Sequence, residues 1–130
     1  FSPKKEPKFL GSTFDRGWDW YLDLFAPGAG RRVRMEGSTK YTSGLAAFRL
    51  APALARRFCP EARIVYLVRH PLDRIVSQWR HVAGRRSLRH PAFADLLRDP
   101  VGRGLILPAS LYWTRLQEWR AHFPDGAILC

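Results

Sequence analysis

The sequence has few cysteines and no long apolar run. Its 130 residues include two cysteines, Cys59 and Cys130, which are too few for a disulfide scaffold and lack metal-ligand spacing. No cluster of His, Cys and Asp residues suggests a metal site. No apolar stretch approaches the roughly 20 residues that a membrane-spanning helix needs, so we expect no membrane span. These features argue against a disulfide-rich, metal-dependent or membrane-spanning protein.

Acidic residues are scarce relative to basic ones. The chain holds 22 Lys and Arg against 11 Asp and Glu, which gives a formal net charge of +11 at pH 7. Such an excess predicts an anionic partner: a nucleotide, a sulfated or phosphorylated substrate, nucleic acid or anionic lipid. The hydrophobic content of 46% with 25% charged residues is typical of a globular chain. The length suits one compact domain, which we place at residues 1–130.

The most informative segment is a strand–turn–helix pattern at residues 63–79. Residues 64–68 are apolar and rich in β-branched types, which predicts a strand covered on both faces. Pro71 suits the first helical position. The core face of the helix that follows is predicted from apolar residues at helical spacing, namely Leu72, Ile75, Val76 and Trp79. Arg69, at the carboxyl end of the strand, and Ser77, on the opposite helix side, can both face the crevice where open α/β sheets bind ligands, and together suit a phosphate or sulfate oxyanion.

Helical and extended patterns alternate along the rest of the chain. We predict helices at residues 15–25, 45–58, 91–98 and after Ser110, with short strands at 8–10, 32–36 and 127–130. Pro52 must kink or restart the second helix, and Ser110 can cap the last one. Residues 99–108 are rich in Gly and Pro and are predicted as a loop. The alternation predicts an α/β layer fold with a mostly parallel sheet.

Several segments occur in the order found in one enzyme family. They are residues 5–9 (KEPKF), 14–21 (FDRGWDWY), 35–41 (MEGSTKY), 69–77 (RHPLDRIVS) and 110–124, with Trp119 and Phe123-Pro124. This order resembles the sulfotransferases that use 3′-phosphoadenosine 5′-phosphosulfate (PAPS), above all the heparan-sulfate-type domain and its bacterial relatives. The resemblance touches nearly the whole chain, and its most specific block is 69–77. It implies a three-layer, P-loop NTPase-like α/β fold with flanking helices, of which residues 1–130 would be a single partial sulfotransferase domain.

The resemblance also implies roles for individual residues. Arg69 and Ser77 match the positions that hold the 3′-phosphate of PAPS. Glu6 matches the glutamate of the family's Lys-Glu-x-x-Phe segment, the base that deprotonates the acceptor hydroxyl or amine. Lys5, its neighbour, would lie near the acceptor.

One acceptor-side segment departs from the family pattern. Glu36 matches the glutamate of the Glu-Lys-Thr-Pro segment that lines the acceptor cleft, but Gly37 stands where the family has lysine. Lys40 is a candidate replacement. The family also binds the phosphosulfate with a Lys- and Gly-rich loop before the Lys-Glu segment, and this chain begins after that point. We therefore expect residues 1–130 to be a piece of a longer protein and to be inactive alone.

Simpler interpretations of the same residues stay open. Arg69 can be a surface arginine at a strand end, and serines on exposed helix faces such as Ser77 are common. Glu6 has three lysines close by in sequence, so a solvated salt-bridge cluster explains it as well. Lys40 either donates to a phosphate or faces water.

The implied function is sulfuryl transfer from PAPS to a hydroxyl or amine acceptor, expected to be a carbohydrate, without a metal. Two alternatives remain. The charge and five tryptophans fit a basic nucleic-acid-binding module, although the aromatics fall on helix core faces, so we expect no specific nucleic-acid partner. A nucleotide kinase of related fold is the other, although no G-x-x-x-x-G-K-[ST] is present. The arginine-rich, cysteine-poor composition favours a bacterial cytoplasmic protein; in a eukaryote the Golgi lumen would be expected.

Overall fold

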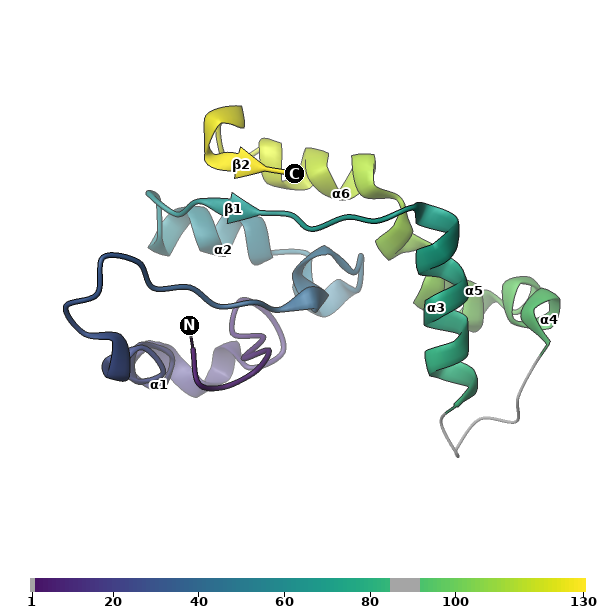
Figure 1. Cartoon of the computed structure of the whole chain (residues 1–130), viewed down its shortest axis with the longest axis horizontal. Coiled ribbons are helices and arrows are strands. Elements are labelled where there is room, and N and C mark those ends of the chain that lie inside the picture. The colour runs from purple at the N-terminus through teal and green to yellow at the C-terminus, as the bar shows by residue number, and fades with distance from the viewer. Residues whose placement is uncertain (1, 85–91) are drawn as a thin grey trace. The chain divides into compact units, whose positions relative to one another are not determined.

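The computed structural model describes residues 2–84 and 92–130, apart from the side chains of Leu96, Val101 and Leu105. The chain divides into two compact units, Phe1–Ala62 and Arg63–Cys130 (Figure 1). None of the helices within the described residues is long and apolar enough to cross a membrane. The assignment of residues 1–130 to a single partial domain stays a prediction.

Helices make up the regular structure of the first unit, and no strand occurs among its described residues. Its elements are η1 (Phe14–Arg16), α1 (Gly17–Asp23), η2 (Ala26–Gly28), η3 (Thr39–Thr42), η4 (Ala46–Phe48) and α2 (Ala51–Phe58). The predicted helix at 15–25 is confirmed as α1, which is shorter at both ends. Pro52 lies in the first turn of α2, so the helix restarts there as expected.

An aromatic cluster forms the core of the first unit around Phe9, which is completely buried. The Phe9 ring stacks on Tyr21 with centroids 4.3 Å apart and meets the Trp18 ring edge-on at 4.8 Å. Such pairs contribute about 0.5–1.5 kcal/mol each beyond the area they bury. The strand predicted at 8–10 is wrong, because this segment is a turn with Lys8 at φ 57°.

The strand predicted at 32–36 is also wrong. The segment belongs to no ladder with described residues, and Val33 and Met35 expose their side chains. Its link to the N-terminal segment is one hydrogen bond, 2.9 Å long, from the Ser2 N–H to the Met35 carbonyl. The residue types suited a strand, but a strand needs a partner over several residues.

The second unit combines helices with a small parallel sheet (Figure 1). Its elements are β1 (Ile64–Val65), α3 (Pro71–Ala83), α4 (Phe93–Arg98), α5 (Pro100–Ile106), η5 (Pro108–Ser110), α6 (Tyr112–Arg120), η6 (Asp125–Ala127) and β2 (Ile128–Leu129). In the sheet, Ile64 pairs with Ile128 and Val65 with Leu129. A helical connection between parallel strands is what the α/β prediction requires.

The strand predicted at 64–68 is confirmed only at its start. The Tyr66 N–H still donates to the Leu129 carbonyl at 2.8 Å, but the ladder does not continue beyond it. Leu67 is 87% exposed and Val68 47%. The expected burial on both faces is therefore not seen within this unit.

Helix α3 is confirmed, but its predicted core face is confirmed only in part, because Leu72 is 64% exposed. It begins at Pro71, and its residues Ile75, Trp79 and Val82 pack against Ile106 of α5. Trp79 also contacts Phe93 of α4 edge-on, with ring centroids 5.7 Å apart. Ile75 and Trp79 of the predicted core face are thus confirmed, and Val82 continues the same helical spacing.

Two predictions near the last helix are wrong. Most of the segment 99–108 forms helix α5 instead of a loop, because the Asp99 carboxylate accepts a hydrogen bond from the Gly102 N–H at 2.7 Å and caps the helix. Ser110 does not cap α6. Its side chain is buried and its hydroxyl donates to the Ile106 carbonyl at 3.4 Å.

Candidate functional site

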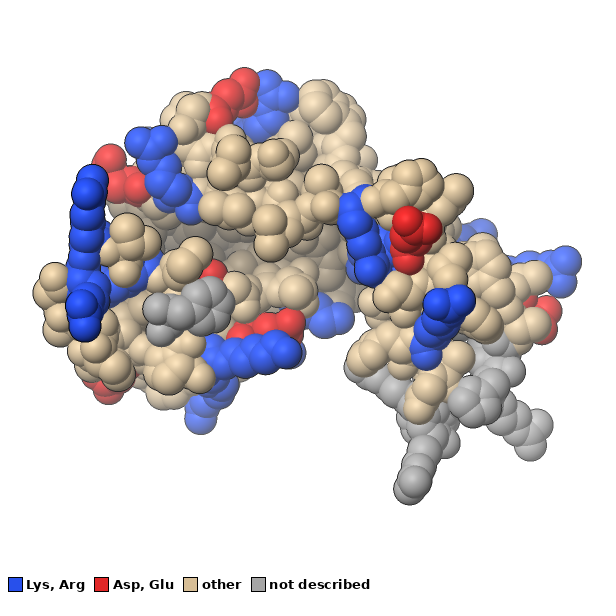
Figure 2. Space-filling view, viewed as in Figure 1, with Lys and Arg blue, Asp and Glu red and all other residues tan. Residues whose placement is uncertain are grey.

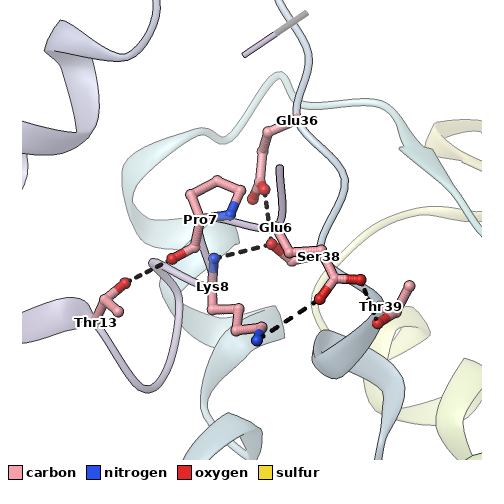
Figure 3. Close-up of polar contacts among 7 residues, drawn as sticks. All are labelled: Glu6, Pro7, Lys8, Thr13, Glu36, Ser38 and Thr39. Atoms are coloured by element: carbon pink, nitrogen blue, oxygen red, sulfur yellow. Dashed lines mark hydrogen bonds and ion pairs between the residues drawn. The ribbon is translucent and has the colours of Figure 1, made fainter. Parts of the chain in front are cut away.

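A strained turn presents Glu6 in the first unit (Figure 3). Glu6 and Lys8, which flank the buried Pro7, both have left-handed backbones, with φ 50° and 57°. Such a conformation costs about 1–3 kcal/mol for a residue with a side chain, so the surroundings must hold it. Thr13 supplies one constraint, since its hydroxyl donates to the Pro7 carbonyl at 2.8 Å. We call residues 6–8 the Glu6 turn.

The Glu6 carboxylate is oriented by two side chains. Its Oε1 accepts a hydrogen bond from the Thr39 hydroxyl at 3.0 Å, and its Oε2 lies 3.7 Å from the Lys8 ammonium (Figure 3). The Glu6 side chain is 27% exposed, so solvent weakens this ion pair to between zero and about 1 kcal/mol. Glu6 therefore makes a salt bridge with a neighbouring lysine, as the solvated salt-bridge cluster predicted, and it also accepts a hydrogen bond from Thr39.

Ser38 connects the Glu6 turn to the second candidate carboxylate. The Ser38 hydroxyl accepts a hydrogen bond from the Lys8 backbone N–H at 2.9 Å and donates one to Glu36 Oε2, also at 2.9 Å. Residues 6–8 and 36–39 are thus joined side by side, as Figure 3 shows. Glu6 and Glu36, distant in sequence, belong to one polar network, which we call the Glu6–Glu36 cluster.

The buried Tyr21 and the half-buried Tyr41 contact the same network. Burial raises the pKa of Tyr41 above its ordinary value, and the hydrogen bond and negative charge of Glu36 raise it further. Burial likewise raises the pKa of Tyr21, with Glu36 as the next cause. Both phenols therefore stay protonated near neutral pH and can donate to the Glu36 carboxylate. The Tyr41 oxygen also accepts from the Leu10 N–H at 3.2 Å.

Lys5 and Lys40 border this cluster through their sequence neighbours. Lys5 is exposed and precedes Glu6, while Lys40 is half-buried in η3 and follows Thr39. Neither side chain makes a hydrogen bond or ion pair with a described residue. The structure brings Glu6 and Glu36 together, and no contact ties the two lysines to them.

Arg69 and Ser77 lie in the second unit, and their side chains make fewer polar contacts than those of Glu6 and Glu36. Arg69 is exposed after β1, and Ser77 is half-buried within α3. Among the described residues neither side chain has a hydrogen-bond or ion-pair partner. The guanidinium fork and the hydroxyl therefore keep their donors free for a ligand.

Sequence reasoning missed several residues that shape these sites. Ser38 and Thr39 are only parts of the segment 35–41 in the sequence, and Lys8 is one of the lysines close to Glu6. Arg74 was not among the residues predicted for the core face of α3, yet its guanidinium donates to the Ile106 carbonyl at 2.9 Å and to the Ser110 hydroxyl at 3.0 Å. Burial lowers the pKa of Arg74, and the charge of nearby Arg69 acts in the same direction.

Basic side chains are spread over the surface. On the face shown in Figure 2, Lys and Arg side chains stand apart around both units and acidic ones are fewer. No group of three or more His, Cys, Asp or Glu side chains suited to a metal ion occurs among the described residues.

Comparison with known proteins decides the family. A model described as the sulfotransferase family matches residues 18–130. The chain belongs to the sulfotransferase family. The match includes Glu36, Lys40, Arg69 and Ser77 and begins after Glu6.

Curated sulfotransferases that act on heparan sulfate by name are among its relatives. The chain is 28% identical over 130 residues to heparan sulfate glucosamine 3-O-sulfotransferase 3B1 of Mus musculus, covering 95% of this chain and 32% of that protein. It is 29% identical over 133 residues to bifunctional heparan sulfate N-deacetylase/N-sulfotransferase 2 of Bos taurus, covering 93% of this chain and 15% of that protein. The chain thus spans about a third or less of the length of these two sulfotransferases.

Proposed function

We propose that the protein containing this chain transfers a sulfuryl group from PAPS to a hydroxyl or amine of a carbohydrate acceptor. The observation that carries the proposal is membership of the sulfotransferase family over residues 18–130. The names of the relatives, which include heparan sulfate 3-O- and N-sulfotransferases, support a glycan acceptor. The three-layer P-loop NTPase-like fold is part of this proposal, and the bacterial cytoplasm or, in a eukaryote, the Golgi lumen is the proposed location.

In the second unit, we assign Arg69 and Ser77 to the 3′-phosphate of PAPS. A guanidinium presents paired N–H donors that match two phosphate oxygens, and the serine hydroxyl adds a third. Their lack of partners among described residues supports this assignment, because no internal bond must break when the phosphate binds. PAPS is a substrate here and leaves as adenosine 3′,5′-bisphosphate.

In the first unit, we assign Glu6 as the base. As the acceptor oxygen or nitrogen bonds to sulfur, the bond from sulfur to the phosphate oxygen breaks, and the acceptor's proton passes to the Glu6 carboxylate. The Glu6 carboxylate, 27% exposed and 3.7 Å from the Lys8 ammonium, is open to a proton from outside the unit. Lys5, Glu36 and Lys40 are assigned to the acceptor side.

The donor assignment is tested by titrating the full-length protein with adenosine 3′,5′-bisphosphate and following its thermal unfolding. We expect saturable stabilisation, because a ligand that binds only the folded state raises its stability. Arg69→Ala should weaken binding by about 10–100-fold, the equivalent of hydrogen bonds to a charged group, while Arg80→Ala, on the exposed surface of α3, should leave it unchanged. Strongly salt-dependent DNA binding without any bisphosphate effect would instead support the nucleic-acid-binding alternative.

A further inference from the structure

We propose that Ser38 and Thr39 are positioning residues for Glu6. Their neighbouring hydroxyls hold the Glu6 turn by its backbone and by its carboxylate, so that one oxygen lone pair of Glu6 faces the acceptor. We call the pair the hydroxyl clamp. The inference rests on the proposed function, in which Glu6 takes the acceptor's proton.

The backbone part of the clamp is Ser38. The left-handed conformations of Glu6 and Lys8 are unfavourable alone and persist only if other contacts select them. Ser38 supplies such a contact by accepting the Lys8 N–H at 2.9 Å. Without it, a half-buried N–H at a strained position would lose its partner.

Glu36 determines which hydrogen bond the Ser38 hydroxyl donates and which one it accepts. An ionised carboxylate accepts hydrogen bonds and donates none, whereas a serine hydroxyl has a single proton. Because that proton goes to Glu36 Oε2, the Ser38 oxygen must present a lone pair to Lys8. The negative charge of Glu36 raises the pKa of the buried Tyr21 and of the half-buried Tyr41, so this anchor lies next to the core of the unit.

The side-chain part of the clamp is Thr39. Ser38 has an extended backbone, with φ −128° and ψ 104°, and Thr39 begins η3. Ser38 reaches the Lys8 backbone N–H, while Thr39 reaches Glu6 Oε1, 3.0 Å away. The Thr39 hydroxyl is the closer partner of the carboxylate, at 3.0 Å against 3.7 Å for the Lys8 ammonium, and its hydrogen bond is directional, so we assign the orientation of the carboxylate to Thr39.

The kinetic test uses three variants of the full-length protein in a PAPS-dependent transfer assay with heparan-type oligosaccharides. Thr39→Val removes the hydroxyl at nearly constant shape and should lower kcat about 10-fold with KM changed much less. Thr39→Ser should restore most of kcat, a rescue that a purely structural role for the Thr39 methyl group would not give. Thr42→Val, in the same η3 turn, is the matched control and should behave as wild type.

A structural test needs no activity. Ser38→Ala should raise the hydrogen-exchange rate of the Lys8 amide about 10-fold, as expected for the loss of one hydrogen bond, while the exposed control Ser12→Ala leaves it unchanged. An active wild type, an inactive Glu6→Gln and a fully active Thr39→Val would overturn the clamp and leave the proposed function intact. A wild type without any sulfuryl transfer would overturn the proposed function; the Lys8 exchange rate then decides the clamp, and an unchanged rate in Ser38→Ala rejects it.

Discussion

The Glu6–Glu36 cluster and the Arg69–Ser77 segment are both candidate parts of one activity, yet they are constructed in opposite ways. In the first, Ser38 is hydrogen-bonded to Glu36 and to the Lys8 N–H, and Glu6 is hydrogen-bonded to Thr39. In the second, Arg69 and Ser77 have no such partner among the described residues. The contrast fits two tasks: a base must be held in one orientation, whereas an anion site must keep its donors free until the ligand arrives.

The largest expected effect on stability comes from the aromatic core beneath the Glu6 turn. Phe9→Ala should lower the free energy of unfolding by about 3–5 kcal/mol, because a completely buried ring leaves a cavity. Phe14→Ala is the matched control: its ring lies 5.3 Å from Phe9 but is partly exposed, so its loss should be clearly smaller. Equal losses in urea unfolding would show that the Glu6 turn does not depend on Phe9.

A smaller effect is expected where Arg74 supports the helix that carries Ser77. Arg74→Met keeps most of the side-chain volume but removes both hydrogen bonds that Arg74 donates and leaves the Ser110 oxygen without its donor, which should cost about 1–3 kcal/mol. Arg80→Met on the exposed side of α3 should change the unfolding free energy by less than about 0.5 kcal/mol. If both variants lose the same stability, Arg74 does not anchor α3.

The cluster should also give the protein a pH dependence at the alkaline end. Tyr41 has an ordinary pKa of 10.0, and burial together with Glu36 raises its pKa in the folded state. Because the folded pKa exceeds the unfolded one, the stabilisation is complete below about pH 10 and is lost as pH rises above it. The unfolding free energy measured from about pH 8 to 12 should therefore fall less steeply in Tyr41→Phe than in wild type. Identical slopes would contradict this.

The smallest effect is expected at an ion pair outside both regions. Arg120 contacts Asp125 through two hydrogen bonds of 2.7 Å, but both groups are solvent-exposed. Asp125→Asn should leave the melting temperature unchanged within error, since exposed pairs contribute little. A clear drop would mean that solvent-exposed pairs matter more here than the contacts within the cluster.

The sequence predicted the secondary structure around Arg69 and Ser77 better than that around the Glu6–Glu36 cluster. Helix α3 was predictable because Pro71 marks its start and apolar residues repeat at helical spacing over three turns. Helix α5 was missed because its Gly and Pro content predicted a loop, although Asp99 caps the helix.

The Glu6–Glu36 cluster could be predicted only in part. Family resemblance pointed to both carboxylates, but the hydrogen bond between Thr39 and Glu6 joins residues 33 positions apart. Glu6 and Lys8 have left-handed backbones although neither is a glycine, the residue type from which this conformation is usually predicted. Contacts that depend on such long-range pairing have no periodic signal in the sequence.

The division of roles proposed for this protein is that Glu6 accepts the proton while Arg69 and Ser77 hold the donor. It is tested most directly by measuring sulfuryl transfer and bisphosphate binding side by side in Glu6→Gln of the full-length protein. We predict a fall in kcat of about 100-fold or more with an unchanged dissociation constant for adenosine 3′,5′-bisphosphate. Full transfer activity in this variant would contradict the claim.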